Sequence, residues 1–78
     1  MDKETQKARI LAYCQKHGSI TIRDAAVKLE MNSPSKRISE MRRMDRYDVQ
    51  SVREERIKDN GEVVRYNRYF ITAVGADG

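Results

Sequence analysis

The sequence is poor in the residues that build metal centres, disulfides and nucleophilic sites. It contains one cysteine and one histidine among 78 residues, and no tryptophan. Cys14 has no second cysteine to pair with, and His17 alone gives neither a zinc site nor a catalytic group its usual partners. Because Cys14 occupies an apolar helical position, we interpret it as a core residue. We expect no metal site, no cofactor and no catalytic residue, and the protein is not expected to be an enzyme.

Long hydrophobic runs are also missing, which bears on the compartment in which the protein is found. No apolar stretch approaches about 18 residues and no signal-peptide pattern is present, so we expect a cytoplasmic protein without a membrane partner. A chain of 78 residues suffices for one domain, which we place at residues 1–74, followed by a flexible C-terminal tail at 75–78. A domain this small has no spare core for a deep cavity, so no small-molecule substrate is expected.

Charge is abundant and unevenly placed. The net charge is +4, with 36% charged residues. Residues 36–46 hold five cations and two anions, which makes +3 and the densest positive block of the chain. A basic surface on a small domain favours polyanions, above all nucleic acid, although charge alone equally fits a protein that is merely soluble and mildly basic.

Three helical segments precede a change of periodicity. Ala8, Leu11, Ala12 and Cys14, with Ile10 as a further candidate, form an apolar stripe in a first helix at 4–17, which ends at Gly18. A strand stub at 19–21 leads into a second helix, capped by Thr21 and Asp24 and ending near residue 30. After a turn in which Asn32 is suited to the left-handed conformation, Ser33 caps a third helix at 34–44, with proline in its first turn.

The last part of the chain alternates like a β-hairpin. Residues 49–57 and 63–72 are rich in β-branched and aromatic side chains. The Asn60-Gly61 pair between them predicts a two-residue type I′ turn. That turn pairs Ile57 with Val64, and a bulge is then needed to align the apolar faces. Phe70 is expected to pack against the body of the domain, together with Val49, Tyr69 and Ile71.

The spacing of the second and third helices is that of a helix-turn-helix, whose second helix enters the major groove of DNA. On the third helix, Lys36, Ser39 and Arg43 lie opposite the apolar seam of Ile38 and Met41. The flanking side chains that complete the candidate DNA-binding set of this helix are Ser35, Arg42 and Arg46, and Ser33 adds a phosphate donor at its start.

Three of the charged residues in this helix have structural alternatives. Cations in a last helical turn are favourable without any ligand, so Arg42 and Arg43 are also explained by the helix dipole. Arg37 lies beside the apolar seam and is expected to form a structural pair, for which Asp24 is the candidate. Glu40 is expected near the exposed side, where it orients Arg43 or lowers non-specific affinity.

The stretch "SITIRDAAVKLEMNSPSKRISEMRRMDRYDV" resembles small winged helix-turn-helix domains of phages and mobile genetic elements. Matching positions are Thr21, Ala25, Leu29, Arg37, Ile38, Glu40 and Arg42, and "RYNRYFI" at 65–71 resembles the last wing strand. The resemblance implies an α+β fold of three helices followed by a β-hairpin wing, with a short strand after the first helix. It also implies that the wing, at 53–66, contacts the DNA backbone or minor groove through Arg56, Lys58 and Arg65. Since acidic side chains offset these cations, a merely solvated hairpin is the alternative.

The function that follows is binding of double-stranded DNA. The protein is expected to be a transcription regulator or a recombination and excision accessory factor, acting as a homodimer or by cooperative assembly on DNA. The alternative is a protein–protein interaction module that uses the same fold to modulate a host protein.

Overall fold

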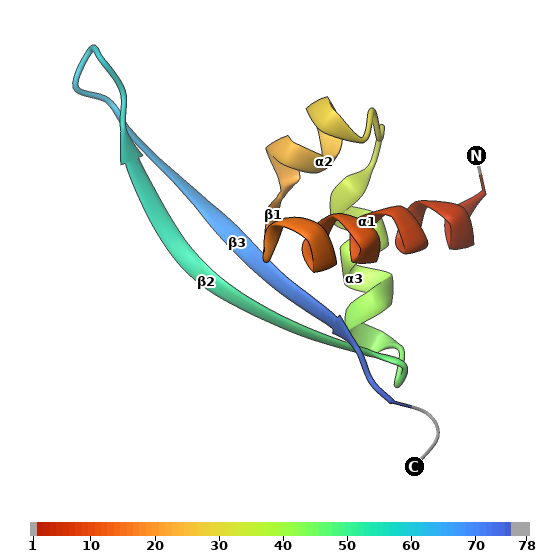
Figure 1. Ribbon diagram of the computed structural model, residues 1–78. Coiled ribbons are helices and arrows are strands. Elements are labelled where there is room, and N and C mark those ends of the chain that lie inside the picture. The colour runs from red at the N-terminus through yellow and green to blue at the C-terminus, as the bar shows by residue number, and fades with distance from the viewer. Residues whose placement is uncertain (1, 76–78) are drawn as a thin grey trace.

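Three helices precede a long β-hairpin in the computed structural model, which describes residues 2–75 (Figure 1). The elements in chain order are α1 (Lys3–His17), β1 (Ile20–Thr21), α2 (Ile22–Lys28), α3 (Pro34–Arg43), β2 (Tyr47–Ile57) and β3 (Val63–Ala73). The strands form one antiparallel sheet in the order β1-β3-β2. The predicted α+β winged helix-turn-helix fold is confirmed. Of the predicted tail, residues 76–78 lie outside the described residues.

Capping residues mark the start of the first two helices and the end of α1, while α2 ends at Lys28, two residues before its predicted end. The Asp2 carboxylate accepts a hydrogen bond from the Thr5 N–H at the start of α1, and Gly18 ends that helix with φ 93°. At the start of α2, the Thr21 hydroxyl accepts from the Asp24 N–H while the Asp24 carboxylate accepts from the Thr21 N–H, each at 3.1 Å. This capping box confirms the predicted helix start.

The turn before α3 differs from the prediction in two ways. Glu30, with φ 55°, is the non-glycine residue of positive φ among residues 2–75, so assigning that conformation to Asn32 was wrong. Ser33 holds the N-cap position, but its side chain caps no described residue of the helix. Its ψ is 63°, whereas the capping residues Asp2 and Thr21 have ψ of 170° and 166°. In Asp2 and Thr21 the extended backbone directs the side-chain oxygen towards the first N–H groups of the helix. The backbone of Ser33 does not direct its hydroxyl there.

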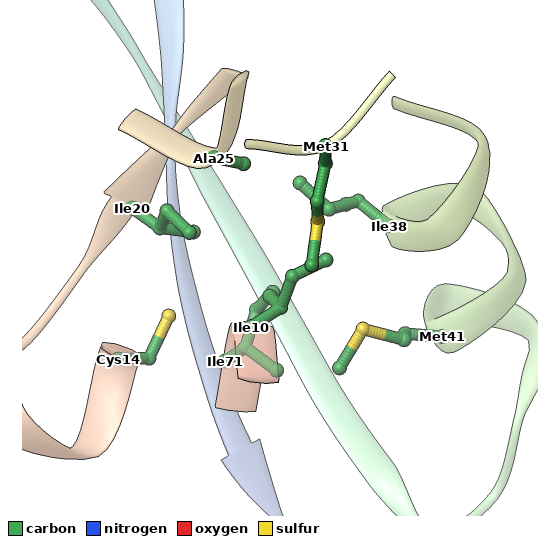
Figure 2. Packing of buried hydrophobic residues seen from close by; sticks show 8 residues of the cluster. All are labelled: Ile10, Cys14, Ile20, Ala25, Met31, Ile38, Met41 and Ile71. Carbon is green, nitrogen blue, oxygen red and sulfur yellow. The ribbon is translucent and has the colours of Figure 1, made fainter. Parts of the chain in front are cut away.

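One cluster of apolar side chains lies where the helices meet β3 (Figure 2). Ile38 and Met41 from α3 are buried there, which confirms the predicted seam. Two other packing predictions were wrong: Ala8 and Ala12 are exposed on α1, and Phe70 is 40% exposed on β3. The complete buried cluster is Ile10, Cys14, Ile20, Ala25, Met31, Ile38, Met41 and Ile71.

The hairpin has a longer loop and a different register from those predicted. Ile57 pairs with Val63, and the register runs from there to the Tyr47–Ala73 pair without a bulge along the two strands. The loop at 58–62 is closed by the Lys58 N–H donating to the Glu62 carbonyl at 2.8 Å. Within residues 2–75, Gly61 has positive φ while Asn60 does not, so the type I′ turn was wrong. The longer loop removes the need for a bulge.

This register gives the hairpin two distinct faces. We call the face that carries Val49 and Ile71 the inner face, since Ile71 is buried in the core and Val49 packs against it. The outer face carries Val52 and Phe70, both of which are exposed. The hairpin extends away from the helices (Figure 1), and the molecule measures 49 × 26 × 21 Å.

Candidate nucleic-acid interface

The exposed side of α3 gathers half of the side chains that the sequence analysis proposed for DNA binding. Pro34, Arg37, Ile38 and Met41 are buried on one side of the helix. Polar and cationic side chains project from the opposite side, because a helix turns 100° per residue. We call this set the α3 surface; it consists of Ser35, Lys36, Ser39, Arg42 and Arg43, all of them exposed.

The turn that positions α3 is tied to α2 through one carbonyl. The Ala25 oxygen accepts from the N–H groups of both Leu29 and Met31, each at 3.2 Å. Ala25 and Met31 are also buried in the core, so the turn is fixed by packing as well as by hydrogen bonds. The second helix of the pair is therefore held with its buried side on the core and its cationic side in solvent.

Strand β2 of the hairpin adjoins the C-terminal end of α3. Arg42 Nη2 donates to Ser51 Oγ on the inner face of β2 at 3.5 Å. At the opposite edge of the sheet from β2, β1 pairs with β3, with Ile20 opposite Tyr69. A helix-turn-helix is thus followed by a hairpin that joins the strand preceding α2.

A family model described as a winged helix-turn-helix domain matches residues 5–74. The chain belongs to this family. Neither a search of curated proteins nor one of solved structures found a match. Membership of the winged helix-turn-helix family supports a DNA-binding regulatory role in general, and such a domain is typically not an enzyme. Within residues 2–75, no helix combines the length and the apolar character that a bilayer crossing requires.

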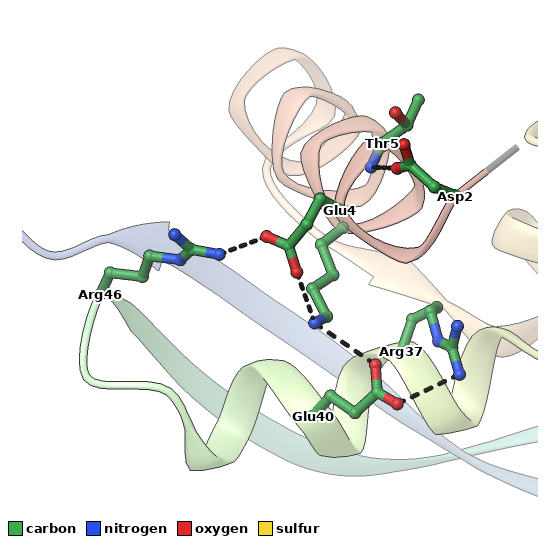
Figure 3. A network of polar contacts seen from close by, with 7 residues as sticks. Asp2, Glu4, Thr5, Arg37, Glu40 and Arg46 are labelled. Atoms are coloured by element: carbon green, nitrogen blue, oxygen red, sulfur yellow. Dashed lines mark hydrogen bonds and ion pairs between the residues drawn. The ribbon is translucent and has the colours of Figure 1, made fainter.

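An ionic network attaches α3 of this winged helix to α1 (Figure 3). Glu40 Oε2 lies 3.1 Å from Arg37 Nη2, and Glu40 Oε1 lies 3.4 Å from Lys7 Nζ. Lys7 Nζ also lies 3.0 Å from Glu4 Oε2. The hydrogen bond from Lys7 lowers the pKa of Glu4, and the same bond raises the pKa of Lys7.

The network corrects two assignments made from the sequence. Arg37 is buried and paired as expected, but its partner is Glu40, because the Asp24 carboxylate accepts from the Thr21 N–H in the capping box. Glu40 points to α1 and does not orient Arg43. The positive charge of the α3 surface is therefore not offset by Glu40, the acidic residue of the helix, because Glu40 pairs with Arg37 and Lys7.

We expect Arg37→Ala to lower the free energy of unfolding by about 1–3 kcal/mol, because it removes a charged hydrogen bond to Glu40. Arg43→Ala, on the exposed side, is expected to change that free energy by less than about 0.5 kcal/mol. Thermal melts of the two variants measure the difference. If Arg43→Ala melts lower than Arg37→Ala, the assignment of the two faces of α3 is wrong.

The predicted cations outside the α3 surface fall into two groups. Arg65 Nε lies 2.9 Å from Glu55 Oε2, because the register places these residues opposite each other. Arg46 pairs with Glu4 and lies 5.5 Å from the centroid of the Tyr47 ring. Arg56 and Lys58 are exposed and have no ionic partner within residues 2–75. Arg56 and Lys58 are therefore available to a ligand, whereas the charges of Arg46 and Arg65 are compensated by Glu4 and Glu55.

The sequence reading missed Arg53, which lies on the inner face two residues beyond Ser51. It is exposed, and Arg53 Nη1 donates to Asn67 Oδ1 at 3.5 Å. Strand alternation alone places residues 51 and 53 on one face, but the contact between Ser51 and Arg42 depends on how α3 packs on β2. Arg68, in contrast, pairs with Glu54 at 2.9 Å, and their hydrogen bond lowers the pKa of Glu54.

Proposed function

We propose that the protein binds double-stranded DNA by placing the α3 surface in the major groove. The observation that carries the proposal is the division of α3 into two sides. Ile38 and Met41 hold one side in the core, while Lys36 and Arg43 project into solvent from the other. An α-helix fits the major groove, and an arginine can donate two hydrogen bonds to one guanine.

The start of α3 adds a phosphate contact to this proposal. The Ser33 side chain makes no capping hydrogen bond, so it does not satisfy the first N–H groups of α3. Such N–H groups, at the positive end of the helix dipole, bind phosphate oxygens. We assign this contact to Ser33 and Ser35, and base contacts to Lys36, Ser39 and Arg43, with Arg42 beside them.

The wing contributes backbone contacts in the same proposal. Arg53, Arg56 and Lys58 provide cations that lack an ionic partner within residues 2–75. Arg46 and Arg65 take a smaller part, because DNA must compete with Glu4 and Glu55 for them. One α3 contacts few base pairs, so a homodimer or cooperative assembly on DNA supplies further specificity. The role we propose is transcription regulation, or assistance to recombination or excision, in a phage or mobile element.

DNA affinity is expected to fall steeply with salt. Among residues 2–75, the cations of α3 and the wing that form no ion pair are Lys36, Arg42, Arg43, Arg53, Arg56 and Lys58. If all contact phosphates, the logarithm of the association constant changes with that of salt concentration with a slope near −5. Fluorescence anisotropy titrations of a labelled duplex at several salt concentrations measure this slope. Saturable binding with a slope near zero would contradict the proposed phosphate contacts.

The second candidate is a protein-interaction module, and the outer face of the hairpin favours it. Val52 and Phe70 are exposed there, beside the compensated Glu54–Arg68 pair. Apolar side chains exposed along the length of a strand face, with no net charge beside them, suit a protein partner better than the phosphate backbone of DNA. Tight binding to a host protein, unaffected by Lys36→Ala and Arg43→Ala, would support this function instead.

A further inference from the structure

The apex of the wing carries an exposed apolar pair. Ile57 is 73% exposed and Val63 is 50% exposed. They are cross-strand partners at the last pair before the loop, so both side chains project from the inner face. No packing role within the described residues explains them, since neither belongs to the core or to the partly buried side chains around it.

The pair lies at a suitable distance from α3 to reach the next groove of the DNA. Ser51, which accepts a hydrogen bond from Arg42, marks the point where β2 meets α3. Ile57 is six residues farther along the strand, about 20 Å at the usual rise. The major groove is about 12 Å wide and the minor groove about 6 Å. With α3 in the major groove, the hairpin therefore crosses one backbone strand and its apex arrives at the adjacent minor groove.

The charges of the apex do not by themselves hold it on DNA. Arg56 and Lys58 have no ionic partner within residues 2–75, and cations of this kind contact the phosphates on either side of a groove. Asp59 and Glu62 in the loop balance them, so the apex is neutral overall. What distinguishes it from the rest of the hairpin is that its exposed apolar side chains, Ile57 and Val63, lie directly opposite each other on the two strands.

We propose that Ile57 and Val63 form an apolar wedge that inserts between base pairs in the minor groove and kinks the DNA. This inference rests on the proposed DNA binding and adds an architectural activity to it. Apolar side chains inserted at a base step partly unstack it and bend the duplex by about 20–90°. The bend brings more of the backbone towards Arg53 and the α3 surface, and this contact offsets the cost of unstacking.

The test compares binding with bending in one duplex. The probe is the tightest-binding duplex recovered from a random-sequence pool, labelled at its two ends with a donor and an acceptor dye. The test variant carries Ile57→Ala and Val63→Ala, both at exposed positions, so its fold should be unaffected. The matched control is Val52→Ala, which removes the same kind of side chain from the outer face at equal exposure, 50%. A 2-aminopurine base placed in turn at each step of the minor-groove segment reports unstacking.

We expect the wild type and Val52→Ala to raise energy transfer between the ends and 2-aminopurine fluorescence at one step. The double variant is expected to lose both signals. Its affinity should fall by less than about tenfold, because removing the wedge removes its contact with the bases and also the free-energy cost of unstacking them. Equal bending by all three proteins, or a straight duplex with wild type bound, would overturn the wedge while leaving DNA binding intact. If the pair instead supports self-association without DNA, the wedge is also wrong. Failure of the wild type to bind any duplex would reject the proposed function and the wedge with it.

Discussion

Ile38→Ala is expected to lower the free energy of unfolding by about 4 kcal/mol. Ile38 is 3% exposed and packs in the cluster that α1, α3 and β3 share. Truncating such a side chain removes its burial and leaves a cavity, at a cost of about 2–5 kcal/mol. Small domains have total stabilities of about 5–15 kcal/mol, so a large part would be lost. Urea denaturation followed by circular dichroism measures the change.

Two variants calibrate that result. Val27→Ala removes an apolar side chain that is 65% exposed on α2, and it should change stability little. Leu29→Ala should fall between the two, because Leu29 is partly buried against the core. A denaturation midpoint for Ile38→Ala close to that of Val27→Ala would show that the buried side of α3 is misassigned.

The double variant Lys36→Ala, Arg43→Ala is expected to bind DNA about 100-fold more weakly. Each side chain lies on the exposed side of α3. Loss of a base or phosphate contact costs about 1–3 kcal/mol, and about 2.7 kcal/mol corresponds to 100-fold. The melting temperature should change little, because neither residue packs in the core. Anisotropy titrations at one fixed salt concentration, with melts on the same samples, separate affinity from stability.

A charge-matched control shows whether the position or the total charge matters. Lys16→Ala combined with Lys28→Ala removes two exposed cations from α1 and α2. That variant should retain affinity within a few-fold, since neither residue is part of the α3 surface. Equal loss of affinity in the two double variants would indicate that net charge alone drives binding and that α3 is not the element that contacts DNA.

Local patterns were sufficient to predict the helices and the exposed side of α3. The capping box of Thr21 and Asp24, the stop at Gly18 and the seam of Ile38 and Met41 depend on residues close in the chain. Such features follow from helix geometry and hydrogen bonding of neighbouring backbone groups.

Features that depend on tertiary contacts could not be predicted from local sequence patterns. The partner of Arg37 was misassigned because Glu40 is drawn towards α1 by Lys7, a lysine that packing buries. The register was wrong because the loop extends over 58–62. Phe70 lies on the outer face because side chains alternate along β3 and its neighbour Ile71 is buried. Arg53 was not selected from the sequence, because the packing of β2 on α3, seen in the Arg42–Ser51 contact, is what shows which face of the hairpin lies towards α3.

The most direct test of the central claim is an NMR titration of the labelled protein with the tightest-binding duplex. We predict that the largest amide shift changes fall on residues 33–43 of α3 and its cap, and on hairpin residues 51, 53 and 56–58. The α1 segment around Lys16 should remain unchanged. Saturable changes confined to the outer face around Val52 and Phe70, with α3 unaffected, would contradict the claim that α3 contacts DNA.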